Sequence, residues 1–251
     1  TQAESSAASD VYKRQKVDFF NKSEQSILLN AENIIVGFSG GVDSTLVLAA
    51  TNQFLEAHNK KNCLTALHVN HQTQSDSSSW QIHCEKFCKE HNINFSCKSV
   101  EIKESGQGYE AAARSARLDI FNAFDEATVI ILGHHLDDQV ETVFFRVLRG
   151  TGLKGLTGMQ RHLKIKDKDF IRPLLHLTKE EIFKQATEYK LSFIEDQSNT
   201  DNAYSRNFLR NEIIPQISKR WPGAKKNTAR MANLLSKQSS LYHRFLLEKL
   251  T

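Results

Sequence analysis

Four short runs of β-branched and apolar residues alternate along this chain with longer segments of helical periodicity. The runs are residues 33–38, 64–69, 94–100 and 128–132. Strands that alternate with helices are typical of β-α-β units, in which the strands are parallel and helices cover the sheet. The sequence therefore predicts an α/β fold with a doubly wound, mostly parallel sheet.

Helices are expected between these strands and in a C-terminal segment. The predicted helices are residues 45–57, 80–91, 109–125, 137–149, 178–190, 205–214 and 224–250. Glycines between residues 150 and 158 predict a loop, and Pro215 is expected to end the helix before it. The last helix is long and amphipathic, which indicates that its apolar face needs a partner surface.

The hexapeptide SGGVDS, residues 39–44, joins the first predicted strand to the helix that follows. Glycine allows the backbone to approach a ligand closely, and the start of a helix presents free N–H groups with a partial positive charge. We expect phosphate to bind Ser39, Gly40, Gly41, Val42, Asp43 and Ser44. Because a carboxylate repels a bare anion, Asp43 is predicted to contact Mg²⁺ beside the phosphates. The alternative is a glycine turn with an Asp-Ser cap.

A second polar cluster, GHHLDDQVET at residues 133–142, follows the fourth strand and opens a helix. His134, Asp138 and Glu141 are spaced four and three residues apart, so they share a helix face. Such a group can hold Mg²⁺ and transfer protons. The alternative is that the acids only favour the helix dipole, which would not explain His134.

Positive charge is concentrated near the C-terminus, although the net charge of the 251 residues is only +4. Residues 202–251 hold ten Lys or Arg against two Glu, which suits either a polyanion partner or a solvated helix face. Arg114 and Arg117, in YEAAARSAR, are further candidates for contacts with phosphate or RNA.

The four cysteines form no C-x-x-C pair, and no run is long and apolar enough for a membrane span. We expect reduced thiols in a cytoplasmic protein.

The first residues do not resemble part of a fold. Residues 5–15, SSAASDVYKRQ, resemble the translation of an adapter used to prepare sequencing libraries. We predict that residues 1–15 are a leader without function. Residues 16–215 are then expected to form the catalytic domain, and residues 216–251 a helical segment that begins a second domain.

Together these motifs carry a family resemblance. SGGVDS resembles the PP-loop of the ATP-pyrophosphatase families, which split ATP into AMP and pyrophosphate. With EAAARSAR, GHHLDDQVETVFFRVLRGTGLKGLTGM, RPLL and EDQSNTDNAYSRNFLRNEIIP, it resembles the bacterial tRNA(Ile)-lysidine synthetase family over about residues 33–215.

The resemblance implies a ligase that uses ATP and Mg²⁺. Its partners would be free L-lysine and the tRNA(Ile) with a CAU anticodon; the sequence leaves a homodimer open. ATP would adenylate the wobble cytidine, and lysine would then displace AMP. The residues implied as catalytic are Asp43, His134, Asp138, Glu141 and Arg114, with Asp43, Asp138 and Glu141 as Mg²⁺ ligands. Those implied in contacts with tRNA or substrate are Arg117, Arg206 and Arg210.

The chain departs from the family pattern in two respects, and two alternative functions remain open. The family usually has a Leu-Arg pair where this chain has Thr73 and Gln74, and its longer members carry extra C-terminal domains. A PP-loop tRNA thiolase would share the ATP chemistry, but such enzymes typically need paired cysteines or an iron-sulfur cluster. A non-catalytic nucleotide-binding module would not need the cluster at residues 134–141.

Overall fold

The computed structural model describes residues 19–70, 77–100, 109–125, 127–195, 202 and 204–250. The chain forms two compact units. The first comprises Thr1–Gly133, His162–Pro173 and Glu180–Glu195, and the second comprises His134–Arg161, Leu174–Lys179 and Asp196–Thr251. The predicted leader, residues 1–15, lies outside the described residues.

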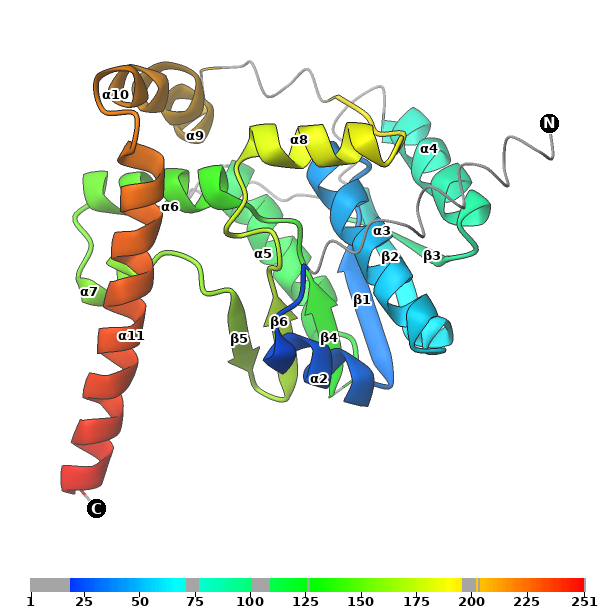
Figure 1. The fold of residues 1–251 in the computed structure, drawn as a ribbon, viewed down its shortest axis with the longest axis horizontal. Coiled ribbons are helices and arrows are strands. Elements are labelled where there is room, and N and C mark those ends of the chain that lie inside the picture. Colours follow the sequence, from blue (N-terminus) through cyan, green and yellow to red (C-terminus); the bar gives the residue numbers. More distant parts are fainter. Residues whose placement is uncertain are drawn as a thin grey trace. The chain divides into compact units, whose positions relative to one another are not determined.

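The first unit is built on a six-stranded sheet with the order β3-β2-β1-β4-β6-β5 (Figure 1). The strands are β1 Asn33–Gly37, β2 Leu64–Asn70, β3 Asn94–Ser99, β4 Thr128–Ile131, β5 His162–Ile165 and β6 Lys168–Ile171. Every neighbouring pair is parallel except β5 and β6, which are antiparallel. The predicted α/β class with a mostly parallel sheet is therefore confirmed.

Helices connect these strands as predicted, with small differences in their bounds. The helices of the first unit are α2 Lys22–Asn30, α3 Val42–Ala57, α4 Ser77–Glu90, α5 Tyr109–Asn122 and α8 Lys179–Glu188, with the short 3₁₀ turn η1 Lys61–Cys63. Helix α3 begins three residues before its predicted start, because its first turn is formed by the SGGVDS residues themselves. Helix α2 and strands β5 and β6 were not predicted.

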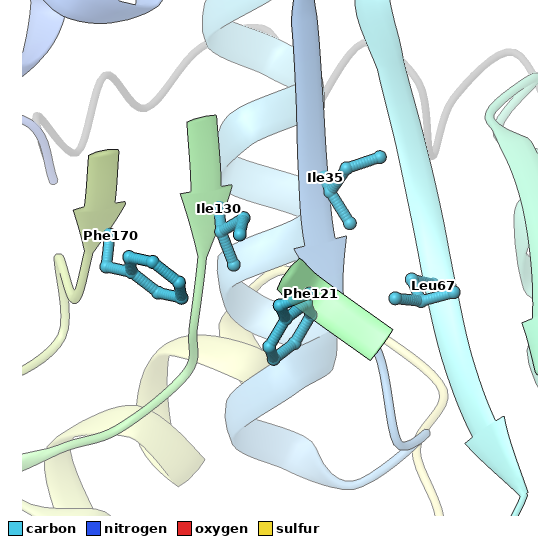
Figure 2. Packing of buried hydrophobic residues seen from close by; sticks show 5 residues of the cluster. All are labelled: Ile35, Leu67, Phe121, Ile130 and Phe170. Carbon is cyan, nitrogen blue, oxygen red and sulfur yellow. The ribbon is translucent and has the colours of Figure 1, made fainter. Parts of the chain in front are cut away.

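The core of the first unit lies against the central strands (Figure 2). Phe121 of α5 packs on Ile35, Leu67, Ile130 and Phe170, which come from four different strands. Helix α3 passes behind the strands on the opposite face (Figure 2). Because both faces are covered, the central strands are apolar at successive positions instead of alternating, as the burial of Ile34 and Val36 beside Ile35 shows.

The second unit is helical. Its elements are α6 Leu136–Leu148, α7 Leu153–Leu156, α9 Ser205–Phe208, the π-helical turn η3 Leu209–Ile213, α10 Ile214–Arg220 and α11 Ala224–Leu250. Leu136 and Val140 of α6 pack on Leu209 and Ile214, with Ala229 of α11 against the same cluster. Grouping by contacts thus places α6 with helices from the C-terminal part. The domain boundary predicted at residue 215 stays a prediction.

Pro215 does not end a helix, contrary to the prediction. It lies in the first turn of α10, which follows η3 without a break. Proline removes one main-chain donor within this continuous helical run, and the π-helical turn directly before it shows the local change in hydrogen bonding.

None of the helices that the structure describes is both long enough and apolar enough to cross a membrane.

Candidate functional site

The SGGVDS segment forms a tight bend between β1 and α3. Gly40 has a φ of +87°, a conformation that favours glycine. A Cβ at Gly40 would lie 3.0 Å from the Cys84 sulfur and 3.3 Å from Cδ1 of Ile194. The Ile194 amide donates to the Gly40 carbonyl at 2.9 Å, which ties this bend to the chain after α8. Glycine at residue 40 is therefore required by both its conformation and its packing.

Hydroxyl groups hold the bend in shape from within. Oγ of Ser44 donates to the Gly41 carbonyl at 3.0 Å and accepts from the Ser39 amide at 3.2 Å. Thr45 adds a hydrogen bond from Oγ1 to the same Gly41 carbonyl at 3.0 Å. Ser44 was predicted as a donor to phosphate, but here its hydroxyl is used to shape the loop.

The groups left facing outward are few. Ser39 is exposed, Gly41 and Asp43 are half-buried, and Val42 is buried. Gly41 precedes α3 as its N-cap residue and has no side chain to cap the first-turn amides. Main-chain N–H groups of the first turn and the Asp43 carboxylate are therefore the chemistry that this bend offers to a ligand.

Gly133, at the end of β4, fits closely under the first turn of α3. A Cβ at this residue would lie 3.0 Å from both the carbonyl carbon and the carbonyl oxygen of Asp43, and 3.1 Å from the Ser44 nitrogen. These are backbone atoms, which cannot move aside without shifting the helix start. The absence of a side chain at Gly133 thus sets the position of the bend.

Replacing Gly133 with alanine is expected to shift the first turn of α3 and to weaken binding of the predicted phosphate ligand by about tenfold or more, since an error of about 1 Å in positioning is costly. The overcrowding should also lower the free energy of unfolding by about 1–3 kcal/mol. Nucleotide titration and urea denaturation measure the two effects. Gly152→Ala is the matched control, because nothing lies within 4 Å of a Cβ there. Equal affinities for the two variants would show that the close packing at Gly133 is unimportant.

The second polar cluster is organised by His135, a residue that the sequence analysis did not single out. The Asp137 amide donates to Nδ1 of His135 at 3.2 Å, and the His135 amide donates to Oδ2 of Asp138 at 3.0 Å. Nε2 of His135 lies 3.4 Å from the same Asp138 oxygen. Because Nδ1 accepts a hydrogen bond, the proton of the neutral ring is on Nε2 and faces Asp138. The capping spacing from residue 135 to residue 138 was the available sequence signal.

Glu141 is paired with Arg210 of η3. Nε and Nη2 of Arg210 donate to the two carboxylate oxygens at 2.6 and 2.9 Å, and Nη2 lies 3.5 Å from Oδ1 of Asp138. Glu141 is only 2% exposed. Burial raises the pKa of Glu141, and the hydrogen bonds from Arg210 offset part of that increase. The structure thus brings together three predicted site residues, but both Glu141 oxygens are already used.

Asp137 has a different role from its neighbour Asp138. One carboxylate oxygen accepts from Nζ of Lys225 at 2.6 Å, and the other accepts from the Lys179 amide at 2.8 Å. Burial alone would raise the pKa of Asp137, but these hydrogen bonds and the Lys225 charge outweigh it and lower the pKa. Asp137 therefore links α6 to Lys225 of α11 and to the main chain at Lys179, all within the second unit.

The other predicted residues lie at separate places. His134 is half-buried at the start of the second unit, and Arg117 is exposed on α5. Arg114 belongs to α5, but its side chain is outside the description. Arg206 lies on α9 in the second unit. Thr73 and Gln74 also fall outside the described residues.

Metal and thiol chemistry can be assessed on the described residues. Among them, no three His, Cys, Asp or Glu side chains are grouped so that they could hold a metal ion by themselves. All four cysteines are free. Burial raises the pKa of both Cys84 and Cys88 to about 12, so that these two remain thiols at neutral pH.

Comparison with known proteins identifies the family to which this chain is similar. The family model of the PP-loop domain matches residues 10–217. The chain is 40% identical over 202 residues to the tRNA(Ile)-lysidine synthase of Legionella pneumophila (strain Lens), covering 80% of this chain and 46% of that protein. It is 37% identical over 224 residues to the tRNA(Ile)-lysidine synthase of Escherichia coli O157:H7, covering 89% of this chain and 52% of that protein. The chain thus spans about half the length of the curated relatives it matches.

A solved structure shares the fold. It is the U34-tRNA thiolase NcsA from Methanococcus maripaludis with its [4Fe-4S] cluster, which superposes with a TM-score of 0.67 at 20% sequence identity. The match covers 92% of this chain and 80% of the thiolase. At this identity the likeness concerns the fold alone. The parallel sheet, the glycine bend before α3 and the family match together show that this chain belongs to the PP-loop domain family.

Proposed function

We propose that this protein joins lysine to C2 of the wobble cytidine in a tRNA(Ile) with a CAU anticodon, at the expense of ATP. The observation that carries the proposal is a glycine bend that leaves the start of α3 without a side-chain cap, in a chain that is 40% identical to a tRNA(Ile)-lysidine synthase over 202 residues. In the first step the C2 oxygen of cytidine attacks the α-phosphorus of ATP, and pyrophosphate leaves. In the second step the ε-amine of lysine attacks C2, and AMP leaves.

The first step needs a triphosphate held in one orientation. The first-turn amides of α3 and the Ser39 hydroxyl are the proposed donors to its phosphates. The hydrogen bonds of Ser44 and Thr45 keep this bend in one conformation before ATP arrives. Positioning of this kind supplies much of the rate in phosphoryl-type transfers. Arg114 stays a proposed contact with ATP phosphate or tRNA, and Arg117 a proposed contact with tRNA.

Mg²⁺ would offset the negative charge of pyrophosphate as it leaves. Asp43 is the proposed ligand from this chain, because it is half-buried at the helix start and Mg²⁺ usually keeps one or two carboxylates plus phosphate oxygens and water. Asp138, whose side chain is 22% exposed, is a second proposed ligand. The pairing of Glu141 with Arg210 argues against a direct metal contact by Glu141.

The second step requires lysine with a neutral amine, so a proton must be removed from its ammonium group. His134 and Asp138 are the proposed acceptors. Nε2 of His135 and Nη2 of Arg210 lie 3.4 and 3.5 Å from the two carboxylate oxygens of Asp138. Arg210 thus acts through Asp138 and Glu141 in this proposal, whereas Arg206 remains a proposed contact with tRNA. Because the proposed substrate is a tRNA, the proposed location of the enzyme is the cytoplasm. A homodimer stays a prediction that sedimentation can test.

Incubation with ATP, radiolabelled lysine and a transcript of tRNA(Ile) with a CAU anticodon tests the function. We expect label to enter the tRNA only when ATP is present, with one AMP released per lysine. An elongator tRNA(Met) transcript is the control for tRNA choice. Incorporation of sulfur from a thiol donor would instead establish a thiolase, and ATP retained without turnover would establish a nucleotide-binding module.

A further inference from the structure

Two arginines from different segments of the second unit lie over one aromatic ring. The guanidinium carbon of Arg149, after α6, is 5.2 Å from the centre of the Phe145 ring, and that of Arg206 on α9 is 5.8 Å from it. Phe145 is half-buried and packs against the Leu136–Ile214 core cluster of this unit. Contacts of this type hold both guanidiniums in place. We call Phe145, Arg149 and Arg206 the arginine clamp.

The positive charge of the arginine clamp has no acidic partner among the residues that the structure describes. In the part of the chain that the structure describes, neither Arg149 nor Arg206 forms an ion pair with a carboxylate. Arg210, one helical turn after Arg206, shows the contrast, because it is fully engaged with Glu141 and Asp138. Two fixed guanidiniums without an acidic partner suit an external anion.

A third arginine adds to the local charge. Nη1 of Arg146 donates to the carbonyls of Gly155 and Gly158, both at 3.0 Å, so this side chain is committed to holding the α7 segment. Burial lowers the pKa of Arg146, and the charge of Arg206 lowers it further. The arginines are thus close enough to repel each other, a cost that a bound polyanion would relieve.

From this arrangement we propose that the arginine clamp binds phosphate groups of the tRNA backbone. The ligand rests on the proposed function, whereas the clamp itself is defined by the contacts above. Arg149 is exposed and Arg206 is half-buried, so both guanidiniums are accessible in part. A guanidinium pairs with phosphate oxygens through two parallel N–H groups, and anchoring on Phe145 reduces the rotamer freedom that is lost on binding. An extended RNA backbone supplies adjacent phosphates, so one strand can engage both arginines.

Binding of the full-length tRNA(Ile) transcript to the whole chain, measured by fluorescence anisotropy across a salt series, tests the proposal. Arg149→Gln and Arg206→Gln should each weaken binding about fivefold or more and reduce the slope of log K against log salt by about 0.7–0.9. The double variant should reduce the slope by about twice as much. Phe145→Leu keeps an apolar side chain against the core but frees both guanidiniums, so it should weaken binding with a smaller change in slope.

Lys184→Gln is the matched control, because Lys184 is a highly exposed cation on α8 of the first unit, where it pairs with Glu188. It should leave both affinity and salt slope unchanged. Because Arg149 is exposed, the Arg149→Gln variant should fold normally. Its tRNA affinity therefore tests the proposal even if the Phe145→Leu variant proves unstable. An unchanged affinity and slope for Arg149→Gln and for Arg206→Gln would overturn the proposal.

A further arm identifies the anion. If ATP or pyrophosphate binding depends on the arginine clamp and tRNA binding does not, the site serves the small phosphates and the proposal fails. The proposed function is tested separately by lysine incorporation. If the variants lost tRNA binding but the parent protein incorporated no lysine, the proposal for the arginine clamp would stand and the proposed ligase activity would be rejected.

Discussion

Asp43→Asn is expected to reduce ATP-dependent release of AMP by a factor of about 10²–10³, the usual loss when one electrostatic contact to the reacting phosphates is removed. Asp43 is half-buried in the first turn of α3, next to the amides proposed to bind phosphate. Asparagine has nearly the same shape but lacks the charge that attracts Mg²⁺. The fold should therefore persist while the metal contact is lost.

The magnesium dependence of nucleotide binding gives a second measure of this change. Parent protein should bind ATP more tightly as Mg²⁺ is added, and Asp43→Asn should lose most of this gain. Asp119→Asn is the matched control, because Asp119 is exposed on α5 away from the bend. Near-normal AMP release by Asp43→Asn would show that Asp43 is not a Mg²⁺ ligand, independently of the roles of the other carboxylates.

The second large effect is expected on stability. Arg210→Met removes both hydrogen bonds to Glu141, which is only 2% exposed and would be left as a buried, unpaired carboxylate. Loss of one partner of a buried pair typically costs about 3–5 kcal/mol. The Arg210 side chain is 37% exposed, so solvent screens part of the interaction. We therefore expect the free energy of unfolding to fall by about 2–4 kcal/mol at neutral pH.

This loss should depend on pH in a defined direction. Burial already raises the pKa of Glu141, and without Arg210 nothing in the pair offsets that increase. A carboxyl group whose pKa is raised by folding binds its proton more tightly in the folded state, so stability decreases as pH rises from the unfolded pKa to the folded one. Arg210→Met should therefore be least destabilising below the unfolded pKa of Glu, about 4.3, and most destabilising above the folded pKa.

A double variant provides the control. Glu141→Gln combined with Arg210→Met removes the titrating group, so urea denaturation should show a smaller loss and no such dependence on pH. With Glu141→Gln as the second single variant, the departure of the double variant from additivity measures the coupling of the pair. If Arg210→Met were as stable as the parent protein from acid to neutral pH, the pairing would have no role in holding α6 against η3.

The sequence alone predicted the first four strands of the sheet and the bend. β-Branched runs at residues 33–38, 64–69 and 128–132 predict buried strands because such side chains suit a sheet covered on both faces. Two glycines between a strand and a helix predict the bend, since few other residues allow its backbone. Strands β5 and β6 were missed because each has only four residues, two of them polar or charged, and so shows little apolar pattern.

Local patterns also predicted the existence of the second polar cluster, but not the role of each member. The sequence places His134, Asp138 and Glu141 on one helix turn or beside it. It does not show that His135 caps α6, because an imidazole is an uncommon cap. Nor does it show that Glu141 is neutralised by a residue 69 positions later in the chain.

Spacing along the chain thus determined the class of fold, the loop before α3 and the residues worth testing, since these depend on backbone preferences and periodicity over a few neighbours. Only the tertiary structure decided which charged side chains are paired with one another. Glu141 is bound by Arg210 and Asp137 by Lys225, whereas Arg149 and Arg206 both lie over the Phe145 ring. The physical reason is that the energy of a charge depends on burial and on partners brought close by folding, and neither is encoded in sequence distance.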